Sequence, residues 1–510
     1  MIVTIKDRLK RVSENPTLSY GILFIVCVFM AVISFDKFLH TNGDNAIYII
    51  LGEAIADGDG YKNMHAPAES FHSQYPPIFP LLIAITHWIT PGTIVDYKIL
   101  VTLFYVASVL ACYWAFSPQS KLIGFLLAII LALNFEIVSF GHWVMSEIPS
   151  MFFAIMTVGF LQRITKNNYK PVVIAGLFCA IGLLTRSALI FLVPSGLLFL
   201  IINKQWKESV VFGISSIGPL LFWGIIKKFY GVSAGGYGAK IFQINPYRPE
   251  LGMASLGDLV QRLVDNFLLY SNSIIPSMTF PTIFNANALA AIRNGQGAIV
   301  FTILAILITI ILVAGIINGI RKKNSLIVSI TVCGCGILLI WPSVWTTQRF
   351  VIPMLPFLLL IGTYGFSLLK NWDKSLWIRG IVFISVIGSN IARIETGRSS
   401  YPVQFAQYKS ASQWIKRNSD KTDIISCRKG EFTYLFSDRK CVRYKYSLKP
   451  DEVVQHLVDN EVKYVIVDQL GFSSTPRYLV PAVKKYPELF KLVYVTQAPE
   501  NYVLEFKYKS

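Results

Sequence analysis

The sequence predicts a polytopic α-helical membrane protein of about eleven transmembrane helices that ends in a small extracytoplasmic α/β domain. Three observations support this fold class. Of the 510 residues, 54% are hydrophobic and only 15% are charged, whereas a soluble globular chain has about 25% charged residues. Apolar runs long enough to cross a hydrocarbon core of about 30 Å recur along the chain. From about residue 403 the composition changes to that of a soluble fold.

Eleven apolar runs are predicted to be membrane-spanning helices. They cover residues 18–38, 97–116, 122–139, 148–163, 171–185, 188–202, 209–228, 297–320, 325–341, 350–369 and 376–392. A twelfth run at 76–89, PPIFPLLIAITHWI, is short and begins with prolines, so we expect a half-helix at the membrane surface. The two runs between 171 and 202 are too short for two full spans and too long for one. We expect a break at Thr185–Arg186, because it removes the guanidinium from the apolar interior.

The basic residues predict the orientation of the helices. If the N-terminus is cytoplasmic, every basic cluster between spans falls on the cytoplasmic side, as the positive-inside rule requires. These clusters are Lys121; Arg163, Lys166 and Lys170; Lys204 and Lys207; Arg321, Lys322 and Lys323; and Lys370, Lys374 and Arg379. The same rule accounts for the net charge of +18 without a nucleic-acid partner. The regions expected outside the cytoplasm are 39–96 (the first loop), 140–147, 229–296, 342–349 and 393–510.

The C-terminal segment has the pattern of a small α/β domain. TDIISC, VKYVIVD, FKLVYVT and YVLEFKY are typical of strands. KPDEVVQHLVDN is typical of an amphipathic helix with acidic residues in its first turn. We therefore divide the chain into a transmembrane module, residues 1–395, and a soluble domain, residues 396–510.

The first loop begins with TNGDNAIYIILGEAIADGDGYKN, which predicts a short amphipathic helix at the membrane interface. Its apolar residues fall in pairs four apart, starting just after Asp44. Two roles are open for Asp44. A carboxylate at the start of a helix can cap the free N–H groups there, or it can take a proton in a reaction.

A set of charges on the outer face favours the second role. Glu147 stands alone just before a span, and three cations, Lys62, Arg186 and Arg349, belong to the same face in the predicted topology. An acid can take the proton of an incoming hydroxyl group. Arginine can bind a phosphate in bidentate fashion and stabilise it as it leaves. The pattern is typical of group transfer from a phosphate-linked donor.

Several motifs together resemble a known family. NGDNAIYIILGEAIADGDGYKN, SQYPPIFPLLIA, FGHWVMSEIPSMFF, LTRSALIFLVP and TTQRFVIPMLPFLLLIG follow one another in the order found in GT-C membrane glycosyltransferases. Over about residues 18–370 the chain is most similar to the dolichyl-phosphate-mannose protein mannosyltransferase-like group of bacteria, which includes aminoarabinose transferases.

The resemblance implies a fold, a reaction and a location. It implies a GT-C enzyme of the bacterial cytoplasmic membrane that takes a sugar from a polyprenyl-phosphate carrier at the outer face, with inversion. The acceptor is a lipid, a glycan or a protein. Asp44 matches the family's presumed base and Glu147 its companion, although many relatives carry Asp at the second position. Aminoarabinose transferases carry Glu-Lys where this chain has Gln74-Tyr75, which argues against a lipid A aminoarabinose substrate and leaves the phosphate-binding cation open among Lys62, Arg186 and Arg349.

The remaining polar residues of the outer loops are assigned as candidate substrate contacts. They are Tyr48, His65, His72, Tyr75, His142 and Trp143. The histidines would have to converge with other ligands to bind a metal, so we expect no cofactor and keep a divalent metal as the alternative. Asp57-Gly58-Asp59 matches the D-x-D pattern of metal–nucleotide sites, but nucleotide sugars are cytoplasmic, so we expect a turn.

Two other kinds of membrane protein are alternatives. A transporter or flippase of lipid-linked saccharide should show internal repeats and charges near the bilayer midplane, and the sequence shows neither. An oligosaccharide polymerase or ligase usually has a large outer loop rich in arginine. The loop 229–296 contains only Arg248, Arg262 and Arg293.

Overall fold

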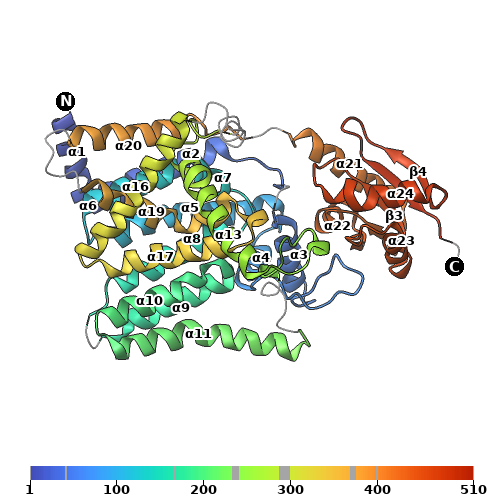
Figure 1. Cartoon of the computed structure of the whole chain (residues 1–510), viewed down its shortest axis with the longest axis horizontal. Coiled ribbons are helices and arrows are strands. Elements are labelled where there is room, and N and C mark those ends of the chain that lie inside the picture. The colour runs from blue at the N-terminus through green and yellow to red at the C-terminus, as the bar shows by residue number, and fades with distance from the viewer. Residues whose placement is uncertain are drawn as a thin grey trace.

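The computed structural model describes residues 2–40, 43–165, 168–232, 240–285, 299–367, 375–397 and 400–508. A bundle of helices forms the larger part of the molecule, and the C-terminal segment forms a separate mixed unit at one end of it (Figure 1). Parts of the predicted loop 229–296 lie outside the described residues.

All eleven apolar runs contain helices. These are α2 (Pro16–Ser34), α5 (Ile94–Phe116), α6 (Lys121–Leu133), α8 (Glu147–Leu161), α9 (Tyr169–Thr185), α10 (Leu192–Ile202), α11 (Trp206–Phe229), α16 (Ile299–Arg321), α17 (Ser325–Ile340), the pair α18 (Gln348–Val351) and α19 (Leu355–Phe366), and α20 (Ser375–Ile391). Within the described residues, five segments are long and apolar enough to cross a membrane: α2, α5, α11, α16 and Gln348–Phe366. The polytopic helical fold is confirmed, and the count of eleven crossings stays a prediction.

The outward faces of the bundle are apolar. On α11, Ile214, Leu221, Phe222 and Ile225 are each more than 60% exposed, and α16 exposes a similar face that includes Val300. An apolar patch of this extent is unfavourable in water and suits contact with lipid chains. The helices α11 and α16 therefore lie at the lipid-facing surface of the bundle.

The chain breaks between α9 and α10 at the predicted position. Arg186 has extended backbone angles (φ −153°, ψ 115°) directly after α9, and a short 3₁₀ turn, Ser187–Phe191, leads into α10. The prediction of two short helices that break at Thr185–Arg186 is confirmed.

The first loop forms two short helices, α3 (Asn45–Ala56) and α4 (Ile78–Ile89), which pack against each other. Gly52 permits this approach, because a Cβ atom there would lie 2.4 Å from Ile83 Cγ2. The predicted turn at Asp57-Gly58-Asp59 directly follows α3, and Gly58 has a positive φ of 88°. The run 76–89 is thus a single short helix beside α3.

Shorter elements complete the bundle. They are α1 (Ile2–Glu14), α7 (Phe135–Phe140), α13 (Leu256–Leu269), a π-helical turn (Tyr270–Ile274) and α14 (Ile275–Thr279).

The C-terminal domain begins with α21 (Val403–Asn418) and contains a five-stranded sheet of order β2-β1-β3-β5-β4. Its strands are β1 (Ile424–Ser426), β2 (Cys441–Val442), β3 (Val462–Val467), β4 (Phe490–Val495) and β5 (Tyr502–Phe506). β1 pairs in parallel with β2 and β3, and β5 is antiparallel to β3 and β4. Its other helices are α22 (Gly430–Ser437), α23 (Pro450–Asp459) and α24 (Val480–Lys485). The four predicted strands and the predicted helix are all present, while the boundary at residue 396 stays a prediction.

The C-terminal domain lies next to α3, at the end of the bundle opposite the N-terminus (Figure 1). Two backbone carbonyls of the first loop hold it there. The Cys441 N–H donates to the His65 carbonyl (2.7 Å), and the Lys440 ammonium donates to the Met64 carbonyl (2.6 Å) and pairs with Glu69. This end of the bundle also contains the predicted site residues.

Candidate active site

Four charged side chains from distant parts of the chain meet in one group, which we call the charge cluster: Asp44, Glu147, Arg186 and Arg349. Arg349 bridges the two acids. Its Nη2 lies 2.8 Å from Asp44 Oδ2, and its Nε lies 2.5 Å from Glu147 Oε1. Arg186 Nη1 lies 3.1 Å from the same Glu147 oxygen. The structure therefore brings together both predicted acids and both predicted arginines.

Four different elements hold the charge cluster. Asp44 precedes α3, Glu147 begins α8, Arg186 occupies the break after α9, and Arg349 lies in α18. The N-terminus of α8 favours a carboxylate, because the partial positive charge of a helix is at that end. Glu147 is completely buried and Arg186 is 8% exposed. The two carboxylates and two guanidinium groups have no net formal charge. This pairing offsets part of the cost of burying the ions.

The charge cluster also has unused hydrogen-bonding capacity. Within the described residues, Glu147 Oε2 and Arg186 Nε are buried without a hydrogen-bond partner. A buried donor or acceptor left unpaired costs about 1–3 kcal/mol. These two atoms therefore mark a place where a bound polar group would be stabilised.

Asp44 does not cap α3. Its side chain makes no capping hydrogen bond. Instead Oδ1 accepts a hydrogen bond from the Tyr75 hydroxyl (2.7 Å), and Oδ2 accepts from Arg349. Burial raises the pKa of the Asp44 carboxyl, but the charge and hydrogen bond of Arg349 and the Tyr75 hydrogen bond outweigh it, so the pKa lies below its usual value. Asp44 is therefore ionised at neutral pH and can accept a proton.

Two tyrosines among the candidate contacts lie at the charge cluster. The Tyr48 hydroxyl is 3.0 Å from Ser146 Oγ, and the same oxygen accepts a hydrogen bond from Arg186 (3.2 Å). The Tyr48 and Tyr75 rings lie 5.1 Å apart. Tyr48 fixes Ser146 and through it Arg186, while Tyr75 fixes Asp44. Sequence analysis did not single out Ser146, although it immediately precedes Glu147.

His72 stacks on Tyr75 and accepts a hydrogen bond from its backbone. The two rings are stacked 5.3 Å apart, and His72 Nε2 accepts a hydrogen bond from the Tyr75 N–H (2.9 Å). His72 Nδ1 lies 2.6 Å from Asn63 Oδ1. This pattern assigns a neutral imidazole with its proton on Nδ1. Burial lowers the pKa of His72 to about 4, with a further contribution from His65.

The lowered pKa of His72 predicts a loss of stability in mild acid. Between pH 6.5 and about 4 the unfolded chain binds a proton at this histidine and the folded chain does not, so stability falls as pH falls through this window. We expect the thermal unfolding midpoint to drop more between pH 7 and pH 5 in the wild type than in His72→Gln. An equal drop in both proteins would contradict this assignment.

Lys62 and His65 lie apart from the charge cluster. Lys62 is exposed, and its backbone forms a bridge to Phe71. His65 faces the C-terminal domain, where its Nε2 is 4.0 Å from Glu431. Burial lowers the pKa of His65 although the Glu431 charge opposes this. Neither side chain contacts the four charges.

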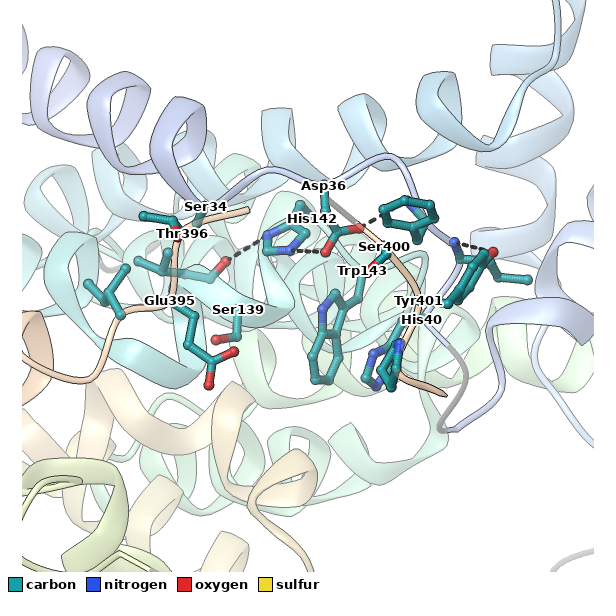
Figure 2. A pocket seen from close by; sticks show the side chains of 15 residues that line it. Ser34, Asp36, His40, Ser139, His142, Trp143, Glu395, Thr396, Ser400 and Tyr401 are labelled. Atoms are coloured by element: carbon teal, nitrogen blue, oxygen red, sulfur yellow. Dashed lines mark hydrogen bonds and ion pairs between the residues drawn. The ribbon is translucent and has the colours of Figure 1, made fainter. Parts of the chain in front are cut away.

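His142 and Trp143 line a separate small cavity of about 60 Å³ (Figure 2). Asp36, His40 and Tyr401 are also in its wall. Trp143 stacks on His40, with ring centroids 3.3 Å apart. His142 Nε2 lies 3.7 Å from Asp36 Oδ2. The Asp36 carboxylate also forms an ion pair with Lys98. No member of the charge cluster lines this cavity, so His142 and Trp143, like His65, lie apart from the charge cluster.

The described residues contain no group of three His, Cys, Asp or Glu side chains that could hold a metal ion. The acids of the charge cluster are instead paired with arginines.

Comparison with known proteins identifies the fold. The family model of dolichyl-phosphate-mannose-protein mannosyltransferases matches residues 74–225, a segment that contains Glu147 and Arg186. No curated protein matches the chain.

Solved structures of membrane transferases match nearly the whole chain. The oligosaccharyltransferase of Archaeoglobus fulgidus in complex with Zn and sulfate has a TM-score of 0.57 and 12% identity, over 96% of this chain and 73% of that chain. The oligosaccharyltransferase AglB of the same organism, in complex with an inhibitory peptide and a dolichol-phosphate, has a TM-score of 0.53 and 12% identity, over 96% and 74%. ArnT of Cupriavidus metallidurans bound to undecaprenyl phosphate has a TM-score of 0.55 and 10% identity, over 95% and 97%.

The helical bundle, its C-terminal sheet domain and the matched family model agree with the resemblance inferred from the motifs. The chain is an integral membrane protein with the fold of these oligosaccharyltransferase and ArnT structures, and its residues 74–225 resemble the dolichyl-phosphate-mannose-protein mannosyltransferases.

Proposed function

We propose that the chain is a glycosyltransferase that moves a sugar from a polyprenyl-phosphate carrier to a lipid, glycan or protein acceptor at the outer face of a bacterial cytoplasmic membrane. The convergence of Asp44, Glu147, Arg186 and Arg349 carries this proposal. It combines an ionised acid with two arginines, one of which has a free donor at Nε. The lipid phosphates named in the ArnT and AglB structures support a donor of the same chemical class.

The proposed reaction is a single displacement that inverts the configuration of the anomeric carbon. The acceptor oxygen attacks the anomeric carbon from the face opposite the phosphate, through an oxocarbenium-like transition state. The bond from that carbon to the phosphate oxygen breaks, and its electron pair stays on the oxygen as polyprenyl phosphate leaves. Asp44 takes the proton of the acceptor hydroxyl. Arg186, through its free Nε, stabilises the negative charge that grows on the phosphate.

Glu147 has a different role from Asp44 in this proposal. It is completely buried and accepts from both arginines through one oxygen. It is therefore a positioning residue that fixes Arg186 and Arg349 relative to each other. Tyr75 orients Asp44 through a direct hydrogen bond. Tyr48 orients Arg186 through Ser146.

A deletion strain tests the proposed function in the cell. Mass spectrometry of its lipids and envelope glycans should show one structure that lacks a single sugar, together with accumulated polyprenyl-phosphate sugar. A plasmid that encodes the wild type should restore the sugar, and one that encodes Asp44→Asn should not. Restoration by Asp44→Asn would contradict the proposal.

The outer-face location predicts where a reporter is active. Basic clusters lie on the opposite side of the predicted topology from the charge cluster, and the two termini lie at opposite ends of the molecule (Figure 1). Alkaline phosphatase folds only outside the cytoplasm, so its fusion after Ser400 should be active, and a fusion after Lys323 should be inactive. The reverse pattern would place the site in the cytoplasm and refute this part of the proposal.

We propose no resident metal ion, because Asp44 and Glu147 are neutralised by arginines. We expect sugar transfer to continue at more than half its rate after treatment with EDTA and gel filtration. The assay is transfer by the purified protein before and after chelation, with a further sample that receives Mn²⁺ or Mg²⁺. A loss of transfer that either ion restores would show that a metal is needed.

A further inference from the structure

The lipid phosphate adds negative charge to a group of residues that is already balanced. Asp44 and Glu147 cancel Arg186 and Arg349, and both arginines are ion-paired with acids. A sugar–phosphate–lipid diester carries one negative charge, and the polyprenyl phosphate that leaves carries more. If the proposed function is right, a further cation should therefore lie beside the charge cluster.

Lys429 of the C-terminal domain is such a cation. It immediately precedes α22, and its Nζ lies 3.5 Å from the carbonyl oxygen of Gly43, the residue before Asp44. Gly43 in turn lies against Arg349, since a Cβ atom on Gly43 would be 3.1 Å from Arg349 Nη1. Burial lowers the pKa of Lys429, although the charges of Glu431 and Asp44 oppose this. The ammonium is thus half-buried and lies near the proposed base.

The Lys429 ammonium has donors to spare. An ammonium has three N–H groups. Among the described residues, Lys429 makes one long hydrogen bond, to Gly43, and a distant contact with the Phe472 ring (5.4 Å to its centroid). The neighbouring cations of the domain are paired more closely: Lys440 with Glu69, and Arg428 with Ser474 Oγ at 2.8 Å. A half-buried ammonium with unused donors is stabilised by an anion.

The C-terminal domain is fixed so that Lys429 keeps this position. Cys441 and Lys440 hydrogen-bond to the backbone of the first loop at His65 and Met64. α22 lies against α3, whose first turn follows Asp44. The domain also contacts the loop that contains Glu250, whose Oε1 lies 2.8 Å from Arg477 Nη2. Contacts with two separate loops hold the domain over the charge cluster.

We propose that Lys429 binds the phosphate of the lipid donor and that the C-terminal domain thereby completes the active site. Lys429 keeps its proton throughout the reaction. Its charge faces the oxygen that receives the electron pair of the broken bond, so it interacts more strongly with the departing polyprenyl phosphate than with the donor. Lys429 would thus be a second phosphate-binding cation beside Arg186, whereas Lys62 is exposed and lies apart from the charge cluster.

The test measures binding of undecaprenyl phosphate to the full-length protein in detergent micelles. We expect Lys429→Gln to raise its dissociation constant at least tenfold, because one hydrogen bond to a charged group is lost. Lys429→Arg, which keeps the charge, should bind within about threefold to fivefold of the wild type. Lys421→Gln, an exposed lysine of the same domain, is the matched control and should bind like the wild type. Undecaprenol, which lacks the phosphate, should show no difference between variants.

A measurement on the wild type guards against a variant that fails to fold. Lysines are methylated with formaldehyde and a borohydride, and the modified peptides are quantified by mass spectrometry. Undecaprenyl phosphate should protect Lys429 and not Lys421, and undecaprenol should protect neither.

The outcomes separate this inference from the proposed function. Equal binding of undecaprenyl phosphate by the wild type and a folded Lys429→Gln, or binding without protection of Lys429, overturns the role of Lys429 and leaves the proposed function in place. No binding of undecaprenyl phosphate by the wild type overturns the lipid-phosphate donor itself, and the inference with it.

Discussion

Asp44→Asn should reduce the rate of sugar transfer by roughly 10²–10⁴-fold, the contribution of a positioned general base. Asparagine has nearly the same shape and can still accept a hydrogen bond from Tyr75 or Arg349, so the fold should persist. What it cannot do is accept the proton of the acceptor hydroxyl. The loss should appear in kcat, because the group acts in the transition state and not in donor binding.

The pH dependence of the wild type should agree with this role. The pKa of Asp44 lies below its usual value because Arg349 and Tyr75 outweigh the effect of burial. The base therefore stays ionised as the pH falls, and its protonation should not reduce the rate until the pH is below the ordinary range of aspartate. The matched control is Asp57→Asn, an exposed acid in the turn after α3, which should transfer at the wild-type rate. Full activity of Asp44→Asn would show that the carboxylate is only structural.

Glu147→Gln should be the most destabilising single substitution in the charge cluster. Glu147 is completely buried between two arginines, and removal of one partner from a buried ion pair costs about 3–5 kcal/mol, because it leaves an uncompensated charge. Transfer should also fall by more than about tenfold, since Arg186 and Arg349 lose the oxygen that aligns them. The measurements are the thermal unfolding midpoint and the transfer rate.

A double variant separates the two effects of Glu147. In Glu147→Gln/Arg349→Gln one acid, Asp44, and one cation, Arg186, remain, so the formal charge of the cluster is again zero. The thermal unfolding midpoint should therefore regain most of the decrease caused by Glu147→Gln alone. Transfer should not recover, because the arginine that pairs with Asp44 and the acid that holds Arg186 are both gone. Recovery of transfer along with stability would mean that Glu147 serves stability alone.

The helical bundle was predictable from the sequence because a lipid environment restricts which backbone structures are stable. Each apolar run became a helix, since a backbone in lipid must satisfy its own hydrogen bonds. The break at Arg186 was predictable because an arginine is costly inside an apolar run. The strands of the C-terminal domain were predictable from short apolar runs such as 462–467.

The candidate site could be predicted only in part. Asp44, Glu147, Arg186 and Arg349 were found because the predicted topology places them at one face, and the structure brings them into contact. Lys62 is nearer to Asp44 in sequence than either arginine, yet the loop after α3 leaves it exposed. Lys429 has no signal in its own segment, because a single lysine before a short helix is common. Its place beside Gly43 depends on how the C-terminal domain packs against the first loop.

Transfer by the purified protein in detergent micelles tests the central claim most directly. The protein is given radiolabelled undecaprenyl-phosphate sugars and, separately, the matching nucleotide sugars, with an envelope extract of the deletion strain as acceptor. Micelles have no two sides, so a flippase would show no transfer. The account predicts that label moves to the acceptor from a lipid-phosphate donor only, that undecaprenyl phosphate is released in equal amount, and that Asp44→Asn abolishes both. Transfer from a nucleotide sugar would contradict this prediction. Transfer by Asp44→Asn at the wild-type rate would also contradict it.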